Sequence, residues 1–267
     1  MVKGRKLRAM IAASVMAALS SGCATSGGTS ADGWRTLFDG RTLDGWTPKI
    51  VGHAAGEDPL NTFKVKDGAI VVGYEEYGGQ FKGRFGHLFY KTPFKAYRLS
   101  FKYRVVGEPL KGTPSYAFYN SGVMVAAQSP QSMTLNQAFP VSSEAQILAI
   151  YAPEKRTTGN VCTPGTNIYM DGVMVRLHCT NSKIAALPVG VWVELEVEVS
   201  PIGVVTQRIN GETAMVYNQV EYDPKDATAR PLIAAAGGAL AIHEGYIALQ
   251  AEGQPIEFKD VRIRTYD

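Results

Sequence analysis

One strand-like segment, residues 142–151, carries an acid and an amide two positions apart. In a β-strand successive side chains point to opposite faces, so Glu144 and Gln146 would share one face. Burying a lone carboxylate costs free energy, so we expect Glu144 to face a cleft, pair with a cation or hold a proton. A solvated strand end with two ordinary polar residues would give the same pattern. Glu144 is therefore the first candidate for a catalytic base.

The four histidines are the other candidates for proton transfer, because imidazole titrates near neutral pH. His87 follows Gly86 and is a candidate acid or metal ligand, although it could equally cap a loop. His178 stands beside a cysteine, and His53 and His243 lie in loop-like sequence. No His-x-x-x-Glu or paired aspartate spacing independently supports a metal site.

Residues 1–22 are predicted to be a lipoprotein-type signal peptide. A basic start and a short apolar run are followed by small residues and then Cys23, which would become the lipidated first residue. Ordinary signal cleavage nearby is the alternative. Residues 23–33 are predicted to be a flexible tether. We therefore expect an exported protein in the bacterial cell envelope, which contacts the membrane only through a lipid anchor.

The charge balance excludes a nucleic-acid-binding role. The chain has 27 basic and 24 acidic residues, and four of the basic ones precede Cys23, leaving 23 against 24. The domain that remains is near neutral and has no basic surface for nucleic acid. In an exported protein the other two cysteines, Cys162 and Cys179, are most simply a disulfide. A metal site that also uses His178 is the alternative.

Residues 34–267 have the pattern of an all-β sandwich of two antiparallel sheets in one domain. Asp67-Gly68 and Asn210-Gly211 are hairpin turns between strand-like runs. Residues 97–105 and 193–199 alternate between apolar and polar side chains, and three glutamates of the second run are predicted to form a solvated face. Further strands are expected at 121–127, 144–151, 245–250 and 256–264.

Four motifs, in order along the chain, resemble the 3-keto-disaccharide hydrolase family. They are Leu37–Gly40 through Leu43–Trp46, Asn120–Met124, Glu144–Gln146 and Gly245–Glu252. The resemblance covers essentially all of residues 34–267. It implies a concanavalin A-like jelly roll, exported bacterial proteins and activity on sugars oxidised at C3, in some members with a divalent metal.

Three positions depart from the pattern that this resemblance implies. Tyr119 stands where an arginine is expected, Ala126 where a polar residue is expected and Gln254 where a histidine is expected. These changes leave the fold expectation intact, but they remove polar groups that a cleft would use.

A ketone at C3 acidifies the C2 proton, so the glycosidic bond can leave by elimination, and water can add afterwards. That chemistry needs a base, an acid and a group that stabilises the enolate. Glu144 is the expected base and His87 the expected acid; both would be the ligands if a divalent metal is bound. Tyr90 and Trp46 are candidates for stacking on a sugar ring. The expected substrate-binding residues are Asn120, Gln146, Lys91, Tyr119 and His178.

Two other functions fit the same residues. A non-catalytic carbohydrate-binding lipoprotein would share the sandwich, because one fold hosts many functions, and a structural envelope protein would keep only a vestigial cleft. A retaining or inverting glycosidase needs a second carboxylate. Glu144 has no obvious partner in the sequence, although Glu75, Glu76 or Glu252 could approach it in space.

Overall fold

The computed structural model describes residue 1, residue 30 and residues 32–266, and in it the domain is a sandwich of two antiparallel β-sheets. In chain order the strands are β1 (Arg35–Thr36), β2 (Trp46–Ile50), β3 (Phe63–Lys66), β4 (Ala69–Val72), β5 (Gly86–Tyr90), β6 (Tyr97–Val105), β7 (Asn120–Ala127), β8 (Ser143–Leu148), β9 (Asn160–Cys162), β10 (Thr166–Met170), β11 (Val173–Met174), β12 (Cys179–Thr180), β13 (Val193–Val199), β14 (Val205–Ile209), β15 (Glu212–Tyr222), β16 (Tyr246–Ala251) and β17 (Ile256–Thr265).

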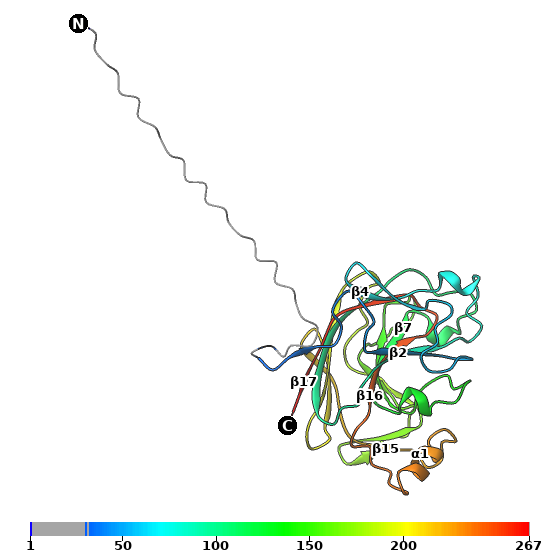
Figure 1. Ribbon diagram of the computed structural model, residues 1–267. Coiled ribbons are helices and arrows are strands. Elements are labelled where there is room, and N and C mark those ends of the chain that lie inside the picture. The colour runs from blue at the N-terminus through cyan, green and yellow to red at the C-terminus, as the bar shows by residue number, and fades with distance from the viewer. Residues whose placement is uncertain (2–29, 31, 267) are drawn as a thin grey trace.

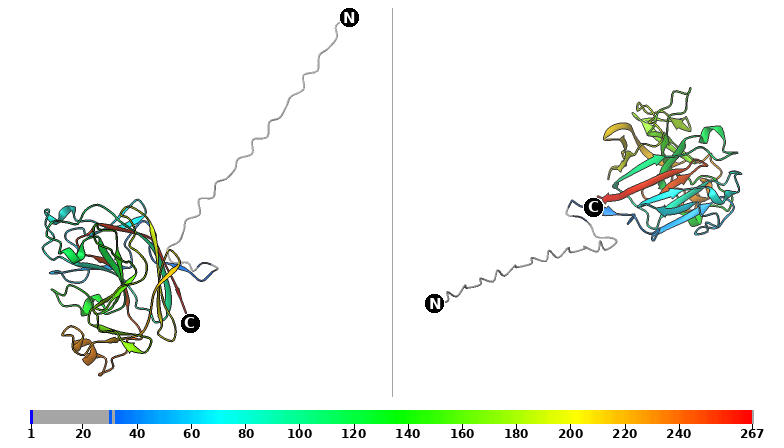
Figure 2. Two further views of the ribbon diagram at one scale, coloured as in Figure 1. Left: turned by 180° about the vertical axis from the view of Figure 1, so that it is seen from behind. Right: turned by 90° about the horizontal axis from the view of Figure 1, so that it is seen from above.

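The two sheets differ in size. The ten-stranded sheet has the order β11-β10-β15-β14-β13-β6-β17-β4-β3, with β1 paired to β17, and the seven-stranded sheet has the order β12-β9-β8-β7-β16-β5-β2. Neighbours in the sheets are often distant in sequence, as in a jelly roll. Figures 1 and 2 show β17 in one layer and β2, β7 and β16 in the other.

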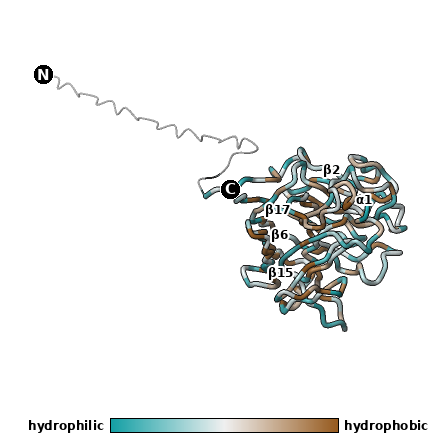
Figure 3. Tube along the Cα trace, turned by 90° about the horizontal axis from the view of Figure 1, so that it is seen from below, coloured by the Kyte–Doolittle hydropathy of each residue, from teal (hydrophilic) through white to brown (hydrophobic). Residues whose placement is uncertain are grey.

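The hydrophobic core lies between the sheets because each sheet turns alternate side chains inward. Leu99 and Phe101 of β6 face Val123 of β7 and Ile147 of β8 across one continuous cluster. Figure 3 shows hydrophobic stretches concentrated along the strands and hydrophilic ones along the loops. The opposite, outer face of the seven-stranded sheet is therefore free to carry polar side chains.

Several sequence predictions are confirmed. The strands β6 and β13 span the two runs that alternate, and Asp67-Gly68 and Asn210-Gly211 form tight turns in which all four residues have positive φ. The structure also shows that the N-terminal segment is fixed to a sheet, since β1 pairs with β17 and the Trp46 indole donates to the Leu37 carbonyl.

One part of the strand interpretation is wrong. Glu196 on β13 is buried rather than solvated, because Arg98 on the neighbouring strand β6 holds it in a two-pronged ion pair. Glu194 and Glu198, on the same face, are only half-buried. The pairing between strands, which the sequence of one strand does not contain, removes Glu196 from water.

Among residues 32–266, helical structure is limited to short segments in the loops. These are the 3-10 turns η1 (Glu75–Tyr77), η2 (Ser115–Ala117) and η3 (Pro130–Ser132) and the helix α1 (Arg230–Ala235). Within residues 32–266 no helix has the length and apolar character needed to cross a membrane. The predicted signal peptide falls outside the described part of the chain.

Candidate active site

Polar side chains follow one another across the outer face of the seven-stranded sheet. Lys49 on β2 is opposite His87 on β5, and His87 is opposite Gln250 on β16. On the other side, Gly122 on β7 is opposite Gln146 on β8, which is opposite Asn160 on β9. Ala248 pairs with Met124, so two residues further on Gln250 comes level with Gly122. The register therefore forms one polar row across six strands.

Glu144 lies beside this row, and its carboxyl group leans over Gly122. A methyl group added to Gly122 would come within 2.4 Å of a Glu144 carboxyl oxygen. Only 6% of Glu144 is exposed, and this burial raises its pKa to about 8, although the neighbouring Gln250 amide partly offsets the rise. The missing side chain at Gly122 thus provides the space in which a buried carboxyl group reaches the polar row.

A second carboxyl group, Glu252, interacts electrostatically with the first. It follows β16 directly and continues the alternation of Ala248 and Gln250 onto the outer face. It is 3% exposed, and one of its oxygens has no hydrogen-bond partner. Burial raises the pKa of Glu252 well above its usual value, and the charge of Glu144 raises it further. The site therefore contains a pair of buried carboxyl groups.

His87 is buried completely, and neither ring nitrogen has a hydrogen-bond partner. Burial, with a contribution from the Lys49 cation, lowers its pKa to about 3, so the imidazole is neutral at neutral pH. Lys49 itself donates to the carbonyls of Ile50 and Leu135, at 3.1 and 3.0 Å, and burial lowers its pKa. A neutral His87 can hold a ligand hydroxyl, but it has no proton ready for a leaving group.

Two loops cover the outer face. Residues 128–142 between β7 and β8 lie over one end, where Phe139 approaches to 6.1 Å between its ring centre and that of His87. Residues 106–119 lie over the other end, where the Tyr116 carbonyl accepts a hydrogen bond from Asn120. Although more than half of Tyr116 is exposed, its partial burial and the charge of Glu252 raise its pKa. The carboxyl pair thus lies between the two loops.

Amide groups complete the polar surroundings of the pair. Both polar atoms of the Gln250 side chain and the amide oxygen of Asn120 are buried without a hydrogen bond of ordinary geometry. Gln146 is half-buried and accepts a hydrogen bond from Asn160 at 2.9 Å, which leaves its own amide nitrogen to donate. Buried polar groups are normally satisfied, so this concentration of unpartnered atoms is typical of a site for a polar ligand.

The structure brings Glu144, His87, Asn120 and Gln146 to the same face, and it places three other candidates elsewhere. Lys91 is exposed at the end of β5, where its backbone N–H donates to the Gly45 carbonyl. Tyr119 stacks on Tyr151 and donates to Glu108. His178 is exposed near the edge strand β12.

The aromatic residues considered for stacking on a sugar lie on the wrong face. Trp46 and Tyr90 are opposite each other on β2 and β5, and both side chains are buried in the core between the sheets. Their rings pack edge to face at 5.2 Å between centres. They stabilise the sandwich and have no surface left for a sugar ring.

Cys162 and Cys179 form the predicted disulfide. It joins β9 to the edge strand β12, and Cys162 is directly opposite Glu144 on β8. The alternative metal site with His178 is therefore wrong for this structure, because both sulfur atoms are used in the bond. The disulfide ties the edge of the sheet beside the carboxyl pair.

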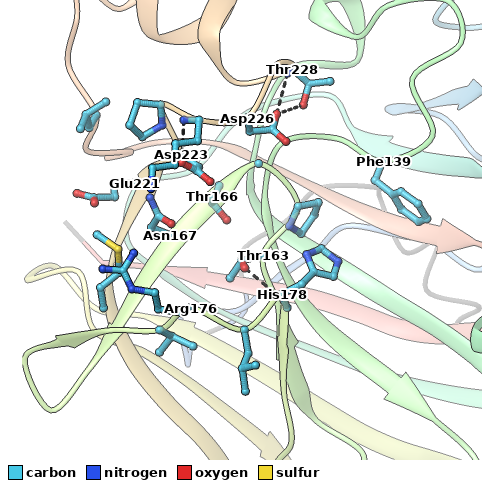
Figure 4. A pocket seen from close by; sticks show the side chains of 18 of the residues that line it. Phe139, Thr163, Thr166, Asn167, Arg176, His178, Glu221, Asp223, Asp226 and Thr228 are labelled. Atoms are coloured by element: carbon cyan, nitrogen blue, oxygen red, sulfur yellow. Dashed lines mark hydrogen bonds between the residues drawn. The ribbon is translucent and has the colours of Figure 1, made fainter.

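A cavity of about 1170 Å³ lies near the same edge, and His178 lines it. Figure 4 shows Asp223 and Asp226 along one wall and Arg176 and His178 along the other. Its floor is tied to β8, since the backbone N–H of Ser142 donates to Pro164 at 3.0 Å and the Thr166 hydroxyl donates to the Ser142 carbonyl. Two lining residues, Pro164 and Thr166, are therefore hydrogen-bonded to the residue two positions before Glu144, but Glu144 itself does not line the cavity. Its lining residues are Thr134, Asn136, Gln137, Ala138, Phe139, Thr163, Pro164, Gly165, Thr166, Asn167, Tyr169, Met174, Val175, Arg176, Leu177, His178, Glu221, Asp223, Pro224, Lys225, Asp226, Thr228 and Leu240.

The donor groups do not fit the divalent metal that the resemblance implies for some members. Among the described residues, no group of three or more His, Cys, Asp or Glu side chains is close enough to hold an ion. His87 on β5 is separated from Glu144 on β8 by the two strands β16 and β7. Hard cations take more oxygen ligands than this pair supplies, so we derive no step through a metal.

The comparison with protein families places the chain in one family. Residues 33–264 match the family described as the 3-keto-alpha-glucoside-1,2-lyase-like domain. The chain belongs to this family. The match includes both sheets, both covering loops and the carboxyl pair.

Individual relatives of the family are distant in sequence. A 3-keto-disaccharide hydrolase of Bacteroides thetaiotaomicron is 25% identical over 257 residues, which cover 89% of this chain and 80% of that protein. A crystal structure from Parabacteroides distasonis, of a protein provisionally named a glycosyl hydrolase, aligns with a TM-score of 0.52 at 18% identity. That alignment covers 89% of this chain and 95% of the other, and it shows a shared sandwich fold.

Sequence reasoning named Glu252 only as one of three acids that could approach Glu144, and it missed Gly122 and Gln250. The available signal was the alternation at the end of β16, where Gln250 and Glu252 occupy the positions two and four residues after Ala248. For Gly122 there was no signal, because its importance depends on which side chain of the neighbouring strand lies over it.

Proposed function

We propose that this chain is an exported enzyme that cleaves 3-keto-glycosides by elimination of the glycosidic bond followed by hydration. The observation that carries the proposal is the buried Glu144 carboxyl group, which lies on the outer face of the sheet among unpartnered amides. Family membership supports the same substrate class.

Glu144 is the proposed base that removes the C2 proton. Its burial raises the pKa to about 8, which gives the ionised form a stronger affinity for a proton than an exposed carboxylate has. Gln250, Asn120 and the amide nitrogen of Gln146 are proposed to hold the hydroxyl groups and the C3 oxygen of the sugar. Donors fixed in a dry site stabilise the enolate because they need little reorganisation when the charge develops.

The position of His87 changes its proposed role. A neutral, buried imidazole with two unpartnered nitrogens is better suited to bind a hydroxyl group than to protonate a leaving group. The side chain of Lys91 is exposed at the end of β5 and the Tyr119 hydroxyl donates to Glu108, so we give neither residue a part in the reaction.

A non-catalytic carbohydrate-binding protein is the second candidate, and the three sequence departures favour it. Gln254 is buried and spends its amide on the backbone of Tyr119 and Val106, and Ala126 packs against Gly245. Neither residue offers a polar group to a ligand. In this reading the same face would bind a sugar without cleaving it.

Incubation with a 3-keto-glucoside distinguishes the proposed enzyme from a non-catalytic carbohydrate-binding protein. We expect wild-type protein to release the aglycone and Glu144→Gln to lose at least about 100-fold in rate, since general bases contribute about 10²–10⁴-fold. The surface variant Glu212→Gln, which alters an exposed carboxyl group on β15, is the matched control. Binding of the sugar by wild-type protein without any turnover would favour the binding protein.

A further inference from the structure

We infer that Glu252 is the second catalytic carboxyl group, which gives a proton to the departing glycosidic oxygen while Glu144 removes the proton from C2. This inference rests on the proposed function and assigns the acid that the reaction still requires.

The placement of Glu252 follows from the strand register. On β16, Ala248 is opposite Met124 and Gln250 is level with Gly122, so Glu252 comes level with Asn120 on the outer face. The Ser121 hydroxyl donates to the Gln250 carbonyl at 2.9 Å, which fixes this register. Glu144 reaches toward the same place from β8, across the space above Gly122. The strands β8 and β16 flank β7 and carry the two carboxyl groups, and Gly122 on β7 leaves the space in which they approach each other.

The pair is not explained as part of a structural ion pair. Among the described residues, the nine ion pairs all involve other carboxyl groups. The buried cation on the same face, Lys49, lies on β2 beside His87 and donates to two backbone carbonyls. Two buried carboxyl groups without a cation cannot both be ionised, so at least one of them keeps a proton.

The surroundings identify the proton holder. The titratable groups beside the pair are Tyr74 and Tyr116, whose pKa values are both raised, and the neutral His87. The charge on Glu144 raises the pKa of Glu252, so Glu252 keeps its proton after Glu144 has lost its own. One unpartnered oxygen of Glu252 is available to a ligand.

The proton transfers balance over the whole reaction. Glu144 accepts the C2 proton, and the C2–H electron pair forms the enolate with C3. The enolate then forms the C1=C2 double bond and restores the ketone, while the C1–O electron pair leaves with the oxygen, which takes the Glu252 proton. Glu144 is now neutral and Glu252 ionised. During hydration Glu252 accepts a proton from the water that bonds to C1, and Glu144 returns a proton to C2.

The test compares two 3-keto-glucosides, one with an alkyl aglycone and one with a 4-nitrophenyl aglycone, which leaves as a stable anion and needs no acid. We expect Glu252→Gln to cleave the alkyl substrate at least about 100-fold more slowly but the nitrophenyl substrate less than tenfold more slowly. It should also continue to exchange the C2 proton for deuterium in heavy water. Glu144→Gln should lose the exchange and both cleavage reactions.

Three outcomes would overturn the inference. Glu252→Gln could cleave the alkyl substrate at the wild-type rate. It could also lose activity on both substrates by the same factor while its unfolding midpoint is unchanged. If Glu252→Gln does not fold, Glu252→Asp repeats the comparison with a shorter side chain. An equal loss of activity on both substrates in that variant would also overturn the inference. A wild-type protein that neither cleaves nor exchanges either substrate overturns the proposed function as well, which distinguishes the two failures. Glu212→Gln is again the control.

Discussion

At the scale of single residues, the environment of Glu144 decides its pH dependence. The proposed base acts only when ionised, and its pKa of about 8 lies above neutral pH. The value of kcat/KM reports the free enzyme, so it should rise about tenfold per pH unit below pH 8, level off above it, and fall only at the higher pH at which Glu252 loses its proton. Between pH 6 and pH 8 we therefore expect an increase of about 50-fold, because half of Glu144 is ionised at a pH equal to its pKa. A pH–rate profile measured with the alkyl 3-keto-glucoside gives this directly, and a flat profile would contradict the assignment.

Gly122 offers a second test, because replacing it removes no ionisable group from the site. In Gly122→Ala the added methyl group would lie 2.4 Å from a Glu144 carboxyl oxygen, so the carboxyl group must move. A displacement of about 1 Å can reduce catalysis about 100-fold, so we expect kcat/KM to fall by about 10–100-fold. The backbone of Gly122 is not in the left-handed region, and the unfolding midpoint should change little. An unchanged kcat/KM would show that Glu144 does not need this space.

At the scale of strands, the sequence predicted the elements better than their surroundings. The alternation in β6 and β13 and the Asp-Gly and Asn-Gly turns identified hairpins correctly, because those signals lie within a few residues. The burial of Glu196 by Arg98 and the approach of Glu252 to Glu144 depend on which strands become neighbours. A single sequence contains no such information, so half of the carboxyl pair and its glycine could not be assigned.

The disulfide makes a prediction at the same scale. It closes a chain segment of 17 residues between β9 and β12, and the chain-entropy estimate for such a loop is about 3 kcal/mol. Replacing Cys162 by Ala and Cys179 by Ser should lower the midpoint of thermal unfolding by roughly 6–12 °C for a domain of this size. Calorimetry with and without a reducing agent measures this.

The midpoint of thermal unfolding of the wild-type protein with reductant should equal that of the double variant without reductant. A double variant as stable as the oxidised wild type would show that the disulfide contributes no stability. Because Cys162 is opposite Glu144, we also expect a fall in kcat/KM, which is smaller than that of Gly122→Ala since the carboxyl group itself is not displaced by a new atom.

At the scale of the whole molecule, the inner faces of both sheets build the core, and the outer face of the seven-stranded sheet presents the site. The ten-stranded sheet contributes Leu99 and Phe101 to the interior, and the seven-stranded sheet uses its inner face for Val123 and Ile147. Its outer face is then free for the carboxyl pair. This division explains how the departures at Tyr119, Ala126 and Gln254 can be absorbed by loops and strand ends without disturbing the sheet that positions Glu144.

The predicted anchor determines where this molecule would meet its substrate. Cys23 follows a basic and apolar start, and residues 23–33 would separate a lipid from the sandwich, which begins with β1 at Arg35. Buried hydrocarbon contributes about 0.8 kcal/mol per CH₂, so more than one acyl chain retains a protein at a membrane. We therefore expect the full chain, expressed in a bacterium, to be recovered with the membranes and to incorporate a labelled fatty acid. Cys23→Ser should lose the label and leave the membrane fraction, while Ser21→Ala, which keeps a small residue before the cysteine, should behave as wild type. Label retained in Cys23→Ser would exclude Cys23 as the lipidated residue, and a wild-type chain without label would favour ordinary cleavage of the signal.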